Sequence, residues 1–248
     1  MTVQLVMAEQ SRKTGKVLSD LLESEGVRVT TSGAKAIVSY GVRIGERGLP
    51  TLNARAGMAD KLEELRELRR NGVLVPAIYE EGRDIKYPLL ARKRQHRAGK
   101  DLMVVFQPEE IPWRRAAGAS YFVEYIPIDT EYRVWVFRTA HLGTYAKIMD
   151  HPDQFKKLGR NFKNGFGFHL VKSDAVPRGA VEAATAAVRA KSLDFGAVDI
   201  LKGKDGKFYT LEVNTAPGVE GPGRMVIQSL ARHIAEWEKK GYPIRKAA

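Results

Sequence analysis

The chain has 248 residues and no cysteine, and its 41 lysines and arginines exceed its 29 aspartates and glutamates, giving a formal net charge of +12. A chain of this length supports one or two domains, and the lack of cysteine excludes disulfides and thiolate sites. No apolar stretch approaches the roughly 20 residues that span a bilayer, and the first apolar run is too short for a signal peptide. We therefore expect a cytoplasmic protein without a membrane partner. Its positive charge favours an anionic ligand, such as a nucleotide, an acidic peptide or nucleic acid.

Apolar periodicity predicts alternating helices and strands, a mixed fold of the α/β (α+β) class. The first elements are a strand at residues 4–7, a helix at 14–24 and a strand at 36–40. A second amphipathic helix is predicted at residues 58–70, and Asn71-Gly72 supplies the usual chemistry of a helix end. The remaining predicted elements are strands at 87–91, 102–106, 121–126 and 132–138 and helices at 181–191 and 225–239. Trp113 and Trp135 are interpreted as packing residues.

Three side chains with oxygen ligands fall on two apolar strands in the last quarter of the chain. Asp199 lies in the first strand, and Glu212 and Asn214 alternate with Leu211 and Val213 in the second. Because strand residues two apart share a face, Glu212 and Asn214 are expected to point together, away from the core that Leu211 and Val213 face. The intervening KGKDGK predicts a hairpin turn that brings Asp199 beside Glu212. Such oxygen ligands suit Mg²⁺. The alternative is a surface hairpin with solvated charges.

A run of cations follows the strand predicted at residues 87–91. Arg92 and Lys93 begin this basic loop, and Gly99 allows a close backbone approach near its end. Cations at a strand end with a nearby glycine are typical of a polyphosphate clamp. The alternative is a basic hairpin tip that contacts nucleic acid or nothing. The phosphate-binding motif GxxxxGK[ST] does not occur in the sequence.

Taken in chain order, these segments resemble the ATP-grasp superfamily, and most closely the RimK-type carboxylate–amine ligases, from about residue 49 to residue 221. The similar segments are LPTLNARAGMADKLEEL, NGVLVPAIY, YPLLAR, FVEYIPIDTEYRVWVF, GRNFKNGFGF and DIL…LEVNTAPGVEG. The resemblance implies an ATP-grasp fold whose two lobes, residues 51–120 and 121–240, enclose ATP. A truncated α/β lobe at residues 1–50 would precede them, and a basic tail at residues 241–248 would follow.

The resemblance also implies a role for individual residues. ATP-binding residues would be Lys61, Arg92, Lys93, Gly99, the adenine hinge Val123, Glu124, Tyr125 and Ile126, and the ribose-binding acid Glu131. Catalytic residues would be Arg133, Lys147, Arg160 and Asn161. Two Mg²⁺ ions, with Mn²⁺ as an alternative, would be held by Asp199, Glu212 and Asn214.

The activity that this resemblance implies is ATP-dependent ligation of a carboxylate donor to an amine acceptor through an acylphosphate. Two other classes of function stay open, a kinase on the same fold and a nucleic-acid-binding protein without turnover. Three features depart from the family pattern. Arg92 stands in place of a lysine and Lys147 in place of an arginine, the loop at Gly99 reads GKD rather than Gly-x-Gly, and the N-terminal lobe is short. These departures weigh against a ribosomal-protein ligase but not against catalysis.

The charge of +12 exceeds what one Mg·ATP requires, and further cations lie outside the ATP motifs. The acceptor is therefore expected to be anionic, as an acidic peptide, a protein tail or a nucleic acid would be. The alternative is a solubilising excess of charge without a partner. The cations concerned are Arg12, Lys13, Lys156, Lys157, Lys163 and Lys172.

Overall fold

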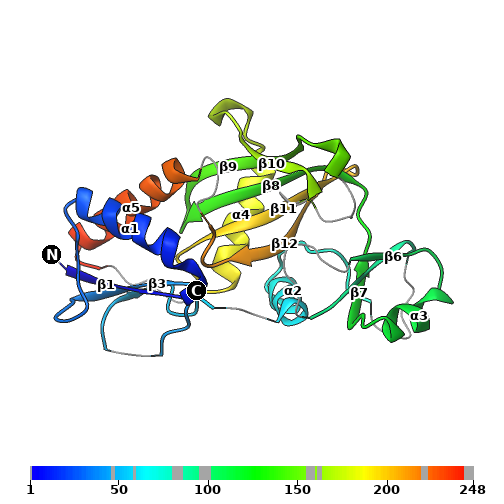
Figure 1. The fold of residues 1–248 in the computed structure, drawn as a ribbon, viewed down its shortest axis with the longest axis horizontal. Coiled ribbons are helices and arrows are strands. Elements are labelled where there is room, and N and C mark those ends of the chain that lie inside the picture. The colour runs from blue at the N-terminus through cyan, green and yellow to red at the C-terminus, as the bar shows by residue number, and fades with distance from the viewer. Residues whose placement is uncertain are drawn as a thin grey trace.

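The structure is a computed structural model that describes residues 2–45, 48–57, 60–79, 86–94, 102–154, 160, 164–218 and 223–242. Its strands form three sheets of four, five and three strands, which follow one another along the long axis of the molecule (Figure 1). The four-stranded sheet comes from the N-terminal part of the chain, the five-stranded sheet lies in the middle, and the three-stranded sheet lies at the far end.

The N-terminal sheet is parallel and has the strand order β2-β1-β3-β4. Its elements are β1 (Thr2–Met7), the 3₁₀ turn Glu9–Ser11, α1 (Arg12–Ser24), β2 (Arg28–Val29), β3 (Ala36–Tyr40) and β4 (Thr51–Leu52). The C-terminal helix α5 (Arg224–Lys239) packs beside α1, so that the two ends of the described chain lie together (Figure 1). Leu18 and Leu22 of α1 share one buried core with Ile227, Leu230 and Ile234 of α5. No helix in the described part of the chain has the length and apolarity to cross a membrane.

The three-stranded sheet is antiparallel, with β5 (Leu89–Arg92) between β6 (Met103–Val105) and β7 (Tyr121–Glu124). The two strands predicted on either side of the basic loop, β5 and β6, are therefore paired with each other. A short helix, α3 (Glu110–Ala116), follows β6. Trp113 on this helix is 77% exposed, so its interpretation as a packing residue was wrong, whereas Trp135 is buried as predicted.

Helix α2 (Lys61–Arg70) lies between the three-stranded sheet and the edge of the central sheet (Figure 1). It begins at Lys61 rather than at the predicted residue 58, because the Asp60 carboxylate caps it. Asp60 Oδ1 accepts hydrogen bonds from the backbone N–H groups of Leu62 at 2.9 Å and Glu63 at 3.1 Å. The helix ends at the predicted Asn71-Gly72, where Gly72 has a φ of +75°.

The central sheet is antiparallel and has the strand order β10-β9-β8-β11-β12. Its strands are β8 (Ile128–Phe137), β9 (Ala140–Met149), β10 (Phe166–Leu170), β11 (Phe195–Gly203) and β12 (Phe208–Asn214), with 3₁₀ turns at Pro152–Gln154 and Ser173–Ala175. Helix α4 (Arg178–Ala190) begins three residues earlier than predicted. The predicted strand at residues 132–138 begins earlier, at Ile128, and the strand predicted at 121–126 ends at Glu124. β9 and β10 were not predicted.

Strand alternation gives the central sheet two different faces. On one face Val134, Val198 and Ile200 pack against α4 in a purely apolar core. On the other face Trp135 and Ala197 join the core of the N-terminal lobe. Because residues two apart share a face, Arg133 and Asp199 also lie on this second face, next to that core and away from α4.

Asn53 links the N-terminal lobe to the central sheet. Its side chain is fully buried, donates to Phe195 O at 2.9 Å, and accepts from the N–H groups of Asp194 at 2.7 Å and Phe195 at 3.0 Å. The Asp194 carboxylate accepts in turn from Asn53 N at 2.9 Å and from Arg138 Nε at 3.0 Å. All of these buried polar groups are therefore paired where β11 begins.

Candidate active site

The hairpin of β11 and β12 has the predicted pairing, in which Asp199 lies directly opposite Glu212. Gly203 N donates to Lys207 O at 2.9 Å across the turn, and Gly206 has a φ of +79° that a glycine adopts readily. A β-bulge follows Asp199 and leaves Leu211 outside the regular pairing. Leu211 consequently packs beside Ile126 and Leu201, while Val213 packs in the core beneath α4, so the prediction of one shared core for both was wrong.

Four charged side chains from three neighbouring strands meet on the second face of the central sheet. Asp199 on β11 accepts two hydrogen bonds from Arg133 on β8, from Nε at 2.7 Å and from Nη2 at 2.9 Å. Lys147 on β9 donates to Asp199 Oδ2 at 3.1 Å and also bonds Glu131 on β8. The sequence resemblance named all four residues, and the structure brings them into one connected network, which we call the charged cluster.

Burial strengthens the interactions within the charged cluster, since Asp199, Lys147 and Glu131 are only 5%, 6% and 7% exposed. Burial disfavours ionisation of Asp199, but Arg133 and then Lys147 outweigh it and hold the pKa of this carboxyl well below its usual range. Burial likewise disfavours the charged form of Lys147, yet Asp199 and Glu131 raise the pKa of its ammonium group above the usual value. Burial raises the pKa of Glu131. The positive charge of Lys147 and, less strongly, that of Arg160 act in the opposite direction.

Phe168 on β10 contributes an aromatic surface that sequence reasoning missed. The Arg133 Cζ atom lies 4.8 Å from the centre of the Phe168 ring, and Lys147 Nζ lies 5.7 Å from it. Both cations therefore gain cation–π interactions in addition to their carboxylate partners. Arg160 makes a similar contact with Phe166, at 5.4 Å. The sequence gives no clear signal for Phe168, because its strand is five residues long and contains Gly167.

The second carboxylate, Glu212, lies on β12 beside the charged cluster and has its own partners. It bonds Lys61 on α2, and its Oε1 accepts from Asn214 Nδ2 at 3.0 Å. Burial and the neighbouring Asp199 raise the pKa of Glu212, but Lys61 and Arg133 outweigh them and lower it overall. Lys61, Glu212 and Asn214 thus extend the charged cluster to the edge of the sheet.

Other predicted ATP-binding residues lie on or beside the three-stranded sheet. Arg92 is paired with Tyr121 across β5 and β7, and its Cζ atom lies 5.8 Å from the centre of the Tyr121 ring. Burial raises the pKa of Tyr121, Arg92 opposes this effect, and the acids Asp60, Glu64 and Glu212 add to it. A Cβ added at Gly118 would lie 3.3 Å from the Lys93 side chain, so Lys93 lies against the end of α3.

The predicted hinge connects the small sheet to the central sheet. Val123 is buried in β7, and Glu124 accepts a hydrogen bond from Ala77 N at 3.4 Å. Tyr125 N donates to Pro88 O at 3.1 Å, and Ile126 packs beside Leu201. Gly99 and Asn161 lie outside the described residues.

The cations assigned to an anionic acceptor are not part of the charged cluster where the structure describes them. Arg12 and Lys13 are exposed at the start of α1, where Arg12 lies 3.6 Å from Glu9. Lys172 is exposed after β10. Lys156, Lys157 and Lys163 lie outside the described residues.

The predicted metal ligands are consistent in chemistry with Mg²⁺. Among the described residues, no three His, Cys, Asp or Glu side chains are arranged to hold a metal ion. The candidate set is instead two carboxylates and one amide on adjacent strands, with Asp199 and Glu212 directly opposite. These oxygen donors suit a hard cation that keeps water and phosphate ligands as well. Lys61, Arg133 and Lys147 neutralise the same two carboxylates in this structure.

The N-terminal lobe touches the segment that follows Asn214. The Tyr40 hydroxyl donates to Pro217 O at 2.5 Å, and Gly57 N donates to Thr215 Oγ1 at 3.3 Å. A Cβ added at Gly41 would lie 2.5 Å from Ala216 Cβ, so only glycine allows this close approach. The residues after the last predicted metal ligand are therefore held by the N-terminal lobe.

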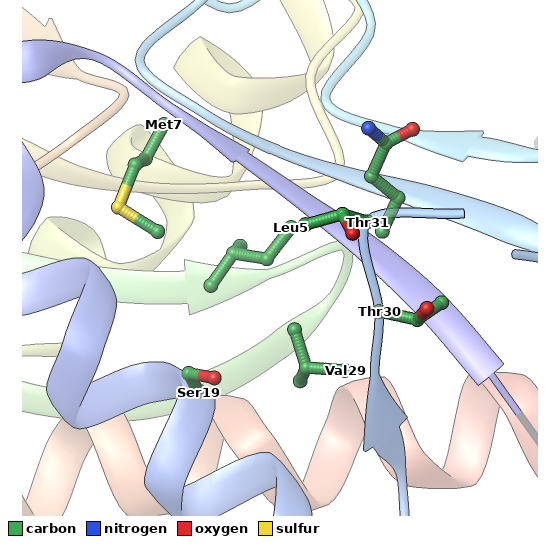
Figure 2. Close-up of a pocket in the computed structure, with 7 residues that line it drawn as sticks. Leu5, Met7, Ser19, Val29, Thr30 and Thr31 are labelled. Carbon is green, nitrogen blue, oxygen red and sulfur yellow. The ribbon is translucent and has the colours of Figure 1, made fainter.

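A separate pocket of about 440 Å³ lies in the N-terminal lobe between α1 and the β1–β2 edge (Figure 2). Apolar and neutral polar side chains line it: Gln4, Leu5, Met7, Ser19, Val29, Thr30 and Thr31. It includes none of the charged residues described above, so a polyphosphate would find no counter-charge among its lining residues.

No protein-family model matches the sequence, and no curated protein is significantly similar to it. Solved structures do match, over nearly the full length of both chains. The D-alanine–D-alanine ligase of Bacillus anthracis complexed with ATP is 16% identical, with a TM-score of 0.60 over 96% of this chain and 99% of that chain. The ATP-grasp ligase PsnB complexed with minimal precursor, Mg and ADP is 12% identical, with a TM-score of 0.66 over 97% of each chain. A RimK-domain ATP-grasp protein from Sphaerobacter thermophilus is 18% identical, with a TM-score of 0.59 over 96% of this chain and 99% of that chain.

The chain therefore has the ATP-grasp fold, as its motifs predicted. A RimK-domain ATP-grasp protein is among the solved structures to which it is similar. At 12–18% identity these matches establish the fold and not the reaction.

Proposed function

We propose that the protein is a Mg·ATP-dependent carboxylate–amine ligase. The observation that carries this proposal is the charged cluster together with Glu212 and Lys61 beside it. Asp199 and Glu212 lie directly opposite each other, and Arg133, Lys147 and Lys61 pair with them. Solved ligases that share the fold support it, among them one complexed with ATP and one complexed with Mg and ADP. The proposal includes the division into an N-terminal lobe (residues 1–50), two ATP-grasp lobes (51–120 and 121–240) and a basic tail (241–248).

The proposed roles follow from charge and position. Arg92, Lys93 and Lys61 would bind phosphate oxygens, the hinge at residues 123–126 would contact the adenine, and Glu131 would bind the ribose. Asp199, Glu212 and Asn214 would hold Mg²⁺, which supplies charge neutralisation of the phosphates when it is bound. Gly99 would take part in ATP binding and Asn161 in catalysis, as the resemblance implies.

In the proposed reaction a substrate carboxylate attacks the γ-phosphorus of ATP and gives an acylphosphate and ADP. An amine then displaces phosphate and forms the amide bond. Arg133 and Lys147, with Arg160 beside them, would stabilise the transferring phosphoryl group and the oxyanion that forms as the amine attacks. Their dense, pre-paired arrangement would reduce the reorganisation needed during the reaction.

The first test is metal-dependent nucleotide binding. Titration calorimetry with a non-hydrolysable ATP analogue is expected to show binding that requires Mg²⁺, because Asp199, Glu212 and Asn214 would hold the cation that neutralises the phosphates. Binding that is independent of Mg²⁺, or no binding, would contradict the proposal. Turnover assays with candidate acids, amines and alcohols, scored by product mass and phosphate release, then distinguish a ligase from a kinase.

The second test concerns the acceptor, which we propose to be anionic. The support is the net charge of +12 and a fold neighbour, PsnB, that has been solved in complex with its precursor peptide PsnA2. Added salt is expected to lower kcat/KM steeply for an acidic peptide acceptor and to change it little for a neutral analogue of equal length. Equal salt sensitivity of the two acceptors would refute an electrostatic role for the excess charge.

A further inference from the structure

Glu64 is a buried carboxylate next to the proposed metal ligands, and the proposed reaction gives it no role. It lies on α2, one turn after Lys61, and it is only 4% exposed. Its Oε1 accepts a hydrogen bond from the backbone N–H of Val213 at 3.3 Å. Val213 is the residue between Glu212 and Asn214, so Glu64 contacts the backbone of β12 between its two proposed metal ligands.

A buried carboxylate needs a counter-charge, and Lys191 provides it. Lys191 follows α4, and its Nζ lies 3.4 Å from Glu64 Oε1 and 3.2 Å from Glu67 Oε2. Glu67 is one turn further along α2 and more exposed, and it contacts Lys191 rather than β12. The two acids therefore share one cation, while only Glu64 reaches the strand.

The position of β12 explains what this contact accomplishes. β12 is the last strand of the central sheet, and no strand among the described residues pairs with its outer edge. Two N–H groups of β12 are satisfied by the segment that contains α2, Thr210 N by Leu74 O at 2.8 Å and Val213 N by Glu64. The β-bulge after Asp199 makes this strand irregular next to the ligands, where its course depends on such contacts.

We infer that Glu64 is a positioning residue of the proposed magnesium site, which fixes the Val213 N–H so that Glu212 and Asn214 lie together beside Asp199. The inference rests on the proposed function, because it assigns a role in metal binding. Two residues on one face of α2 contact neighbouring positions of β12. Lys61 bonds the side chain of Glu212, and Glu64 accepts from the backbone N–H of Val213. Since α2 lies between β12 and the three-stranded sheet, one helix connects the metal ligands to the small sheet (Figure 1).

The test combines two measurements on the full chain. Hydrogen exchange of the Val213 amide is followed by NMR in the metal-free protein, and Mn²⁺ binding in the presence of ADP is followed by electron paramagnetic resonance. Glu64→Ala is expected to accelerate exchange at Val213 and to weaken Mn²⁺ binding by about 10–100-fold, the usual effect of removing a group that orients a metal ligand. Glu64→Asp keeps the charge beside Lys191 but is one methylene too short to reach the Val213 N–H. It is expected to show the same losses, and it serves as the test variant if Glu64→Ala does not fold.

Two matched variants separate positioning from general stability. Glu64→Gln retains a carbonyl oxygen for the Val213 N–H, so it is expected to restore both values towards those of the native protein. Glu67→Ala removes the other partner of Lys191 and is expected to leave both values unchanged. Native Mn²⁺ affinity in Glu64→Ala or Glu64→Asp would overturn the positioning role alone. A native protein that binds no Mn²⁺ would overturn the proposed function and this inference with it.

Discussion

Glu212→Ala is expected to abolish Mg²⁺-dependent turnover while the protein remains folded. Glu212 lies opposite Asp199 and would supply the second carboxylate of the proposed metal site. Removing it would leave one carboxylate and one amide, too few protein ligands to hold the metal charge near the phosphates. Since preorganised electrostatic stabilisation is usually the largest catalytic term, we expect turnover to fall by about 10³-fold or more.

Turnover is measured with the acid and amine that the substrate screen identifies, and folding is checked by circular dichroism. Glu236→Ala is the matched control, because Glu236 is an exposed acid on α5 whose partner is Lys240. That variant is expected to retain full activity. If Glu212→Ala retained the native turnover, the assignment of Glu212 as a metal ligand would be wrong.

Arg133→Met is expected to reduce turnover by at least about 100-fold and to lower the stability of the fold. The Arg133 guanidinium makes both of its hydrogen bonds to Asp199 and stacks over Phe168. Methionine retains much of the side-chain volume but leaves Asp199 with Lys147 as its only hydrogen-bonded cation among the described residues. We expect the free energy of unfolding to fall by about 2 kcal/mol, less than the roughly 3–5 kcal/mol typical of a broken buried ion pair, because Lys147 remains.

Two variants distinguish the chemistry of Arg133 from its contribution to stability. Arg133→Lys keeps the charge but loses the two-pronged geometry, and an intermediate loss of turnover is expected. Arg138→Met breaks the ion pair of Arg138 with Asp194 at the far end of the same strand, so it is expected to lower stability and leave turnover intact. If Arg133→Met and Arg138→Met lower turnover equally, the role of Arg133 is structural. Chemical denaturation and steady-state kinetics on the same preparations provide both values.

The sequence predicted those parts of the site that depend on short-range signals. The hairpin followed from one Asp-Gly turn between two alternating strands, so the pairing of Asp199 with Glu212 could be predicted from about 20 residues of chain. The capping chemistry at Asn71-Gly72 similarly predicted the end of α2. The alternation of apolar residues in these two strands could not predict the bulge after Asp199, because a single extra strand residue leaves no compositional signal.

The parts that were missed depend on contacts between distant segments. β9 contains Gly143 and two alanines, and β10 has only five residues, so neither shows a clear alternation of apolar and polar residues. Phe168 and the strand position of Lys147 were missed for that reason, although the family resemblance had named Lys147. Glu64 reads as one more acid on the surface of an amphipathic helix. Only the tertiary packing of α2 against β12 and Lys191 reveals that it is buried.

The joining of the first and last helices has a consequence for how the protein is made. The apolar side chains of α1 are covered by α5, and Tyr40 pairs with a carbonyl 177 positions later in the chain. Until α5 has been synthesised, Leu18 and Leu22 lack the part of their cover that this helix provides. Contacts of such large sequence separation form slowly, because the intervening chain must first close a long loop. The N-terminal lobe is therefore completed only after α5 has been synthesised, and until then its uncovered apolar side chains are exposed to aggregation.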